Sequence, residues 1–164
     1  MSRWAEHQRQ QASKSAARCR GIDLAPVVFL ISQEELAAVP ARILVVEDDP
    51  ANRSLLTKFL RHLGYQLAEA SDGTQALELA QGVGVDLILL DLGLPALDGY
   101  LVARRLKSDP ATGKIPLVAL TAYALQGDRE KATAAGCDYY VSKPFDLDQL
   151  GALIEQALAR RADD

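Results

Sequence analysis

The stretch VDLILLD, residues 85–91, places an apolar run directly before an acidic residue, Asp91. A short apolar run of this kind is typical of a strand that is buried on both faces of a parallel sheet. Because burying a lone carboxylate is costly, we expect Asp91 at the open carboxyl end of that strand, where ligands of such sheets bind. The earlier run RILVV, residues 42–46, also ends in acids, at residues 47–49.

The chain from residue 41 onward repeats an alternation of strand and helix patterns. Asp49-Pro50 predicts a helix start, with an N-cap followed by proline in the first turn, and Gly64 predicts the end of that helix. Five strands and five helices are expected in all. The strands are predicted at 42–46, 65–69, 85–90, 116–120 and 138–142, and the helices between Pro50 and Gly64 and at 73–81, 98–107, 126–135 and 146–160.

This alternation predicts an α/β fold, in which helices cover both faces of a parallel sheet. Right-handed crossovers leave few topologies, and the flavodoxin-like (βα)5 doubly wound sheet with strand order 2-1-3-4-5 sets strands 1 and 3 side by side. That order gathers the acids that follow both strands into one crevice. A cluster of carboxylates repels itself and favours a hard divalent cation, so the pattern predicts a Mg²⁺ site.

Two further strand ends supply different chemistry at the same edge. Thr121 follows the predicted strand 116–120, and Lys143 follows the predicted strand 138–142. Carboxylates, a hydroxyl and an ammonium group together can hold both Mg²⁺ and a phosphoryl group. A carboxylate can also act as a nucleophile and form an acyl phosphate.

These residues lie in motifs that resemble those of one family. From about residue 41 to 161, the chain resembles the receiver domain (CheY-like) of two-component response regulators. The intervals from Asp91 to Thr121 and to Lys143, 30 and 52 residues, also suit that family. The motifs that carry the resemblance are Val46-Glu47-Asp48-Asp49, Leu90-Asp91-Leu92-Gly93-Leu94-Pro95, Leu97-Asp98-Gly99, Leu120-Thr121-Ala122 and Lys143-Pro144-Phe145.

The resemblance implies a phosphoacceptor and a metal site. Asp91 would take a phosphoryl group from phosphohistidine on a sensor histidine kinase or a histidine phosphotransfer protein. Asp48, Asp91 and the backbone carbonyl of Gly93 would bind Mg²⁺ directly, and Glu47 would act through water. Such a domain catalyses only its own phosphorylation and dephosphorylation, so the resemblance implies a signalling protein rather than an enzyme.

The resemblance also implies a conformational switch. Lys143 would neutralise oxygens of the transferring phosphoryl group, and Thr121 would hydrogen-bond to the bound phosphoryl group. Tyr140 would occupy the aromatic switch position of the family. The Lys143-Pro144 peptide bond is expected to be cis.

Composition restricts the partners. From residue 41 onward there are 13 basic and 18 acidic residues, a net charge of −5, so nucleic acid is not an expected partner. No apolar stretch has the 18 or so residues that span a bilayer. Cys19 and Cys137 lack ligand spacing and are predicted to be reduced thiols, which favours a cytoplasmic protein.

We therefore predict a single-domain response regulator that signals to a downstream protein. Residues 1–40 are predicted to be an N-terminal extension, disordered or partly ordered, and residues 41–161 the receiver domain. One alternative is a receiver derived from a hybrid histidine kinase. Another is a small-molecule phosphatase with Asp91 as nucleophile, but that class commonly carries a general acid two residues later, where this chain has Gly93.

Other polar residues near the predicted site have simpler interpretations. Asp49 and Asp98, which precede Pro50 and Gly99, are predicted to be helix N-caps rather than metal ligands. For Tyr140, the alternative to the switch role is that the side chain only packs in the hydrophobic core.

Overall fold

The computed structural model of the chain describes residues 40–82, 84–95, 97–122 and 126–163. Residues Pro40–Ala162 form one compact unit. The extension predicted for residues 1–40 lies outside the described residues, apart from Pro40.

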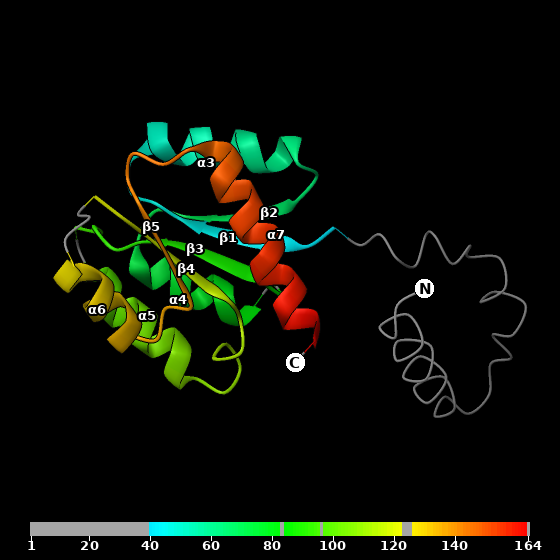
Figure 1. Cartoon of the computed structure of the whole chain (residues 1–164). Coiled ribbons are helices and arrows are strands. Elements are labelled where there is room, and N and C mark those ends of the chain that lie inside the picture. The colour runs from blue at the N-terminus through cyan, green and yellow to red at the C-terminus, as the bar shows by residue number, and fades with distance from the viewer. Residues whose placement is uncertain (1–39, 83, 96, 123–125, 164) are drawn as a thin grey trace, which may run out of the picture. The chain divides into compact units, whose positions relative to one another are not determined.

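Five parallel strands form a single sheet in the order β2-β1-β3-β4-β5 (Figure 1). The predicted flavodoxin-like order is therefore confirmed, and β1 and β3 are neighbours. The observed strands lie within two residues of the predicted ones. They are β1 (Arg42–Val46), β2 (Gln66–Ala70), β3 (Leu87–Asp91), β4 (Leu117–Thr121) and β5 (Tyr139–Ser142).

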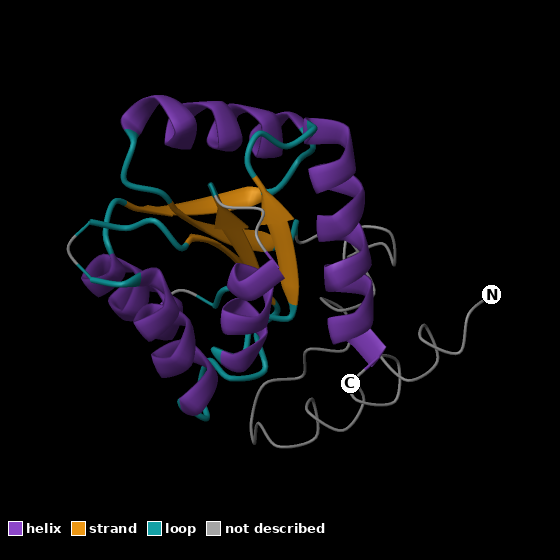
Figure 2. Ribbon diagram, turned by 60° about the vertical axis from the view of Figure 1, so that its left-hand side comes forward, coloured by secondary structure: helices purple, strands orange, loops and turns teal. Residues whose placement is uncertain are grey.

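Five helices alternate with the strands and cover both faces of the sheet (Figure 2). Helices α3 and α7 lie on one face, and α4, α5 and α6 lie on the other (Figure 1). The helices are α3 (Pro50–His62), α4 (Gly73–Gly82), α5 (Gly99–Ser108), α6 (Gln126–Ala134) and α7 (Leu147–Asp163). None of the described helices is both long enough and apolar enough to cross a membrane.

The three central strands carry apolar side chains to both faces, which explains their continuous apolar runs. In β3, Leu87 and Leu89 pack with helices α3 and α7, whereas Ile88 and Leu90 pack with α4 and α5. All five residues of β3 are buried. The strand therefore sits deep in the molecule, with Asp91 at its carboxyl end.

Local signals set the ends of the helices. The Asp49 side chain accepts a hydrogen bond from the backbone N–H of Asn52 (2.8 Å), and the Asp98 side chain accepts one from Tyr100 (3.0 Å). Both capping predictions are confirmed. Gly64, with φ of +89°, follows α3 in the left-handed conformation that favours glycine, so the predicted stop is also confirmed.

Candidate functional site

The sheet topology brings acids from two strands together at its carboxyl edge. Val46 of β1 pairs with Leu90 of β3, so the residues that follow them, Glu47 and Asp91, lie side by side. Oxygens of Glu47, Asp48 and Asp91 lie within 4.8 Å of one another. Glu47 is 1% exposed and Asp91 is 6% exposed, while Asp48 is more open to solvent. The predicted acidic cluster is thus present in the structure.

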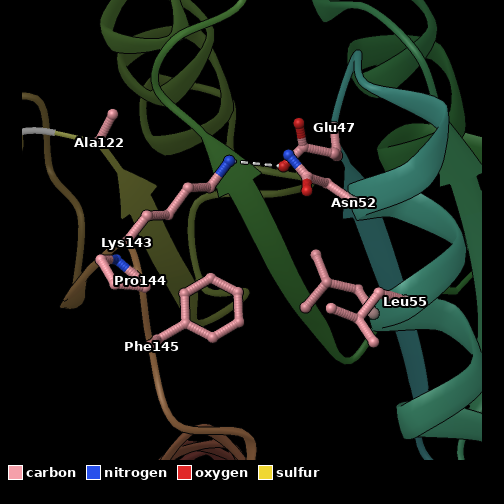
Figure 3. A pocket seen from close by; sticks show the side chains of 8 residues that line it. Glu47, Asn52, Leu55, Ala122, Lys143, Pro144 and Phe145 are labelled. Carbon is pink, nitrogen blue, oxygen red and sulfur yellow. Dashed lines mark hydrogen bonds and ion pairs between the residues drawn. The ribbon is translucent and has the colours of Figure 1, made fainter.

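One lysine bridges two of these acids. The Lys143 Nζ lies 2.7 Å from Glu47 Oε2 and 2.8 Å from Asp91 Oδ2. Figure 3 shows this side chain extending from the loop after β5 toward Glu47. The Lys143 backbone N–H donates to the Thr121 carbonyl (2.7 Å), which ties that loop to β4. The Lys143-Pro144 bond is cis, as the resemblance implied.

Burial and charge act together on the titrating groups of the site. Burial raises the pKa of Glu47, and the nearby charge of Asp91 raises it further, although the hydrogen bond from Lys143 opposes both effects. Burial acts to lower the pKa of Lys143, but its hydrogen bonds to Asp91 and Glu47 outweigh that effect and the pKa is raised. Lys143 therefore stays protonated, and one cation faces three carboxyl groups.

The donor set fits a hard divalent cation. Three carboxyl groups converge, and a single ammonium group cannot neutralise them all. Carboxylate and carbonyl oxygens are the ligands that Mg²⁺ prefers in proteins. The residues that could hold the ion are Asp48 and Asp91, with Glu47 close enough to take part.

The loop after β3 orients the Asp91 carboxylate. The Gly93 backbone N–H donates to Asp91 Oδ1 (2.9 Å), while Lys143 holds Oδ2. The Leu92 backbone N–H donates to the Leu120 carbonyl (2.9 Å), which continues the β3–β4 ladder beyond Asp91. Both oxygens of the acid are therefore held in place, and its orientation is fixed from two sides.

The remaining predicted residues lie on the neighbouring strands. Thr121 is the last residue of β4 and is buried. It is paired with Ser142 of β5, immediately before Lys143. Tyr140 lies on β5, partly buried against the core on the α4 and α5 side of the sheet. The structure therefore places Thr121 at the edge with the acids, and Tyr140 two residues short of the end of β5.

Sequence reasoning missed the walls of the crevice beside the acids. A crevice of about 380 Å³ adjoins Glu47 and Lys143 and is lined on its apolar side by Leu55 and Phe145 (Figure 3). Leu55 lies on helix α3 and is 53% exposed. Residue type gave no signal for this position, because the neighbouring Leu56 is buried.

Comparison with known proteins identifies the family. The family model described as "Response regulator receiver domain" matches residues 43–155. The chain therefore belongs to the receiver-domain family of two-component response regulators, as the resemblance implied.

Individual relatives agree with this assignment. The chain is 37% identical to the polar-differentiation response regulator DivK of Brucella anthropi, over 66% of this chain and 89% of that protein. It is 41% identical to the DNA-binding dual master transcriptional regulator RpaA of Synechocystis, over 74% of this chain. The match spans only about half, 50%, of the length of RpaA.

Solved structures show the same fold. The receiver domain of a Pseudomonas aeruginosa sensor histidine kinase is 39% identical, with a TM-score of 0.69 over 74% of this chain and 99% of that one. That structure holds a magnesium ion in its active-site cleft. A CheY-like receiver from Methanospirillum hungatei is 24% identical, with a TM-score of 0.71 over 76% of this chain and 98% of that one. At that identity, the second likeness concerns the fold alone.

Proposed function

We propose that this receiver accepts a phosphoryl group on Asp91 from phosphohistidine, in a step that depends on Mg²⁺. The observation that carries the proposal is the site itself: a buried aspartate, held by Lys143, among carboxyl groups with a surplus of negative charge. The likeness to DivK and to a receiver whose structure contains magnesium supports it.

The transfer is a displacement at phosphorus. A new bond forms between an Asp91 carboxylate oxygen and phosphorus as the bond from phosphorus to the histidine nitrogen breaks. The electron pair of the broken bond stays on the imidazole nitrogen. Catalysis of such a step is mainly a matter of positioning and of stabilising charge. The Gly93 N–H and the Lys143 ammonium supply the positioning, since each holds one oxygen of Asp91.

Charge stabilisation comes from cations near the phosphoryl oxygens. When bound by Asp48, Asp91 and the Gly93 carbonyl, with Glu47 acting through water, Mg²⁺ would neutralise phosphoryl oxygens. Lys143 has its ammonium 2.8 Å from the acceptor carboxylate, so it can turn to the incoming phosphoryl group with little movement. Its raised pKa keeps the group charged for that purpose.

Signalling would follow from a change in hydrogen bonding at the edge of the sheet. The acyl phosphate would offer new acceptor oxygens, and the hydroxyl of Thr121, at the end of β4, would donate a hydrogen bond to one of them. A shift of Thr121 would alter the space next to Tyr140, whose ring would then move inward. Such a switch needs only a few kcal/mol of differential interaction between two packings.

The phosphodonor would approach over the crevice next to Lys143. Its floor carries Glu47 and Lys143, and its wall carries the exposed Leu55 together with Phe145 (Figure 3). A partner protein that presents a histidine to Asp91 would cover this apolar wall. The proposed donor is a sensor histidine kinase or a histidine phosphotransfer protein, and the output is a further protein contact.

The alternative function of a small-molecule phosphatase is less well supported. Hydrolysis in that class needs a general acid close to the nucleophile. Two residues after Asp91 stands Gly93, which offers Asp91 only its backbone N–H. Lys143, the other group on the carboxylate, has a raised pKa and is a poor acid at neutral pH.

The proposal is tested by intact mass after incubation with acetyl phosphate. The wild-type chain with Mg²⁺ should gain the mass of one phosphoryl group, and the gain should disappear with EDTA or in Asp91→Asn. Asp98→Asn is a matched control, because Asp98 caps α5 and is not expected to accept the group. Full labelling of Asp91→Asn would disprove the assignment of the acceptor.

A further inference from the structure

An arginine donates hydrogen bonds to the backbone of the loop that carries Glu47 and Asp48. Arg53, in the first turns of α3, directs its Nη1 back to the backbone carbonyl of Glu47 (2.6 Å) and to that of Asp48 (3.2 Å). These are the carbonyls of the two acids that follow β1. A single guanidinium nitrogen thus bridges the backbone of the residues that contribute to the proposed metal site.

The same guanidinium is braced by the neighbouring strand. The Arg53 Nε lies 3.9 Å from Glu69 Oε2 on β2, and Glu69 also accepts a hydrogen bond from Arg61 (2.8 Å). The Glu47 backbone N–H donates to the Ala70 carbonyl at the end of β2 (3.2 Å). Glu47, at the start of the loop, and Arg53 therefore both contact β2.

The loop has a physical need for such a contact. Residues 47–49 are three consecutive acids whose side chains repel one another, and Glu47 must stay buried. The Arg53 side chain is only 21% exposed, so its hydrogen bonds compete little with water. A planar guanidinium can direct one nitrogen to the two carbonyls while another faces Glu69, which limits how the Arg53 side chain can turn.

We propose that Arg53 is a positioning residue for the divalent-cation site, acting through the backbone of Glu47 and Asp48. This inference rests on the proposed Mg²⁺-dependent function. Arg53 holds the two carbonyls so that the side chains of Glu47 and Asp48 converge on Asp91. It does not itself touch the ion.

A purely electrostatic role of Arg53 predicts the opposite change in Mg²⁺ affinity when the residue is removed. If Arg53 acted only as a positive charge near the acids, its removal would strengthen the binding of Mg²⁺. If it holds the loop, its removal weakens binding even though a repulsive charge is lost. Lysine separates the two roles, because Arg53→Lys keeps the charge but has a single nitrogen, which cannot face the loop carbonyls and Glu69 together.

The test is Mg²⁺ affinity measured by calorimetry on the full chain, without any phosphodonor. Arg53→Ala and Arg53→Lys should each bind Mg²⁺ roughly tenfold more weakly, the lower end of the loss seen when groups that orient metal ligands are removed. Arg61→Ala is the matched control, since it removes the other partner of Glu69 and leaves the loop carbonyls untouched. Its affinity should stay within about twofold of the wild type.

The outcomes separate the inference from the proposed function. Wild-type affinity in Arg53→Lys, or tighter binding in Arg53→Ala, overturns the positioning role while leaving the proposed function intact. A wild-type chain that binds no Mg²⁺ overturns the metal step of the function itself. If Arg53→Ala fails to fold, Arg53→Gln, which keeps one donor group, replaces it and must show the same weakening.

Discussion

At the scale of single residues, the site depends on one cation shared between two buried acids. Lys143 bridges Glu47 and Asp91, and neither acid has much access to water. A buried ion pair of this kind adds little net stability, but removing one partner leaves an uncompensated charge. Lys143 therefore has a structural role in addition to the chemical role that we propose for it.

Lys143→Ala should destabilise the protein by about 1–3 kcal/mol in EDTA, because two acids then face each other with no cation between them. Added Mg²⁺ should restore more stability to this variant than to the wild type, since the ion then meets no competing ammonium. Thermal unfolding with and without Mg²⁺ measures both effects. Lys131→Ala, which removes an exposed lysine paired with Asp128, is the control. An equal Mg²⁺ shift in variant and wild type would contradict this account.

Cys137 should behave as a buried thiol. Burial raises its pKa to about 11, and the charge of Asp138 adds to the effect while that of Lys107 opposes it. In Cys19→Ser, the rate of alkylation by iodoacetamide should therefore rise with a midpoint near pH 11 in the folded protein, and near 9 in urea. Between pH 9 and about pH 11, the Cys137 thiol keeps its proton in the folded state and loses it in the unfolded state. The free energy of unfolding should therefore fall as the pH rises through this range. Equal midpoints in both states would refute the prediction.

At the scale of elements, the start of helix α5 lies against the loop that carries Asp91. A Cβ at Gly99 would lie 2.5 Å from Leu92 Cα and 2.8 Å from the Asp91 carbonyl oxygen. Both contacts are with backbone, which cannot move aside without moving Asp91, the proposed phosphoacceptor. The glycine after the Asp98 cap is thus required by close packing.

Gly99→Ala should therefore cost about 2 kcal/mol or more and slow labelling by acetyl phosphate, because the loop shifts with its acid. Gly82→Ala is the matched control in a neighbouring helix, where a Cβ would meet nothing within 4 Å. That change should be neutral or stabilising by up to about 1 kcal/mol. Chemical denaturation and labelling rates of the two variants provide the comparison, and equal losses of stability would argue against the packing explanation.

Helix α3 presents two exposed leucines that differ in their distance from the site. Leu55 lines the crevice beside Lys143, whereas Leu63 follows the last turn of the helix. They are 53% and 42% exposed, so both can change to aspartate without opening the core. Substitutions at these two leucines can therefore distinguish an effect on the docking of a protein donor from an effect on phosphoryl transfer itself.

Leu55→Asp should reduce transfer from an autophosphorylated histidine kinase by tenfold or more, because a charge enters the apolar wall that the donor covers. Labelling by acetyl phosphate should change little. Leu63→Asp should leave both reactions unaffected. The measurement uses whichever purified kinase labels the wild-type chain. A parallel loss with both donors would show that Leu55 affects the site and not docking.

At the scale of the whole molecule, the sequence predicts the sheet well because its signals are local and repeated. Strand and helix patterns that alternate along the chain place every strand within two residues of its observed bounds. The largest error lies at β3, which begins at Leu87 and not at residue 85. The Asp86 carboxylate accepts a hydrogen bond from the backbone N–H of Arg42 (2.8 Å). The first residue pair between β1 and β3 is therefore Ile43 with Leu87, one residue after Asp86.

The site was only partly accessible to the same reasoning. Glu47 and Lys143 each follow a strand and Asp91 ends one, so the topology alone brings them together. The roles of Arg53 and Leu55 depend on contacts across elements that no spacing reveals. Arg53 donates hydrogen bonds to backbone carbonyls. Every residue has a backbone carbonyl, so residue types do not indicate such a contact.

Residues 40–163 contain both hydrophobic cores and every group of the proposed site, so they should suffice for folding and chemistry. A variant comprising residues 40–164 should gain one phosphoryl group from acetyl phosphate at a rate similar to that of the full chain. Its thermal midpoint should also be similar, because none of its described packing is removed. Intact mass and calorimetry test the two expectations. A midpoint lower by roughly 4 °C, equivalent to about 1 kcal/mol, would show that residues 1–39 stabilise the receiver.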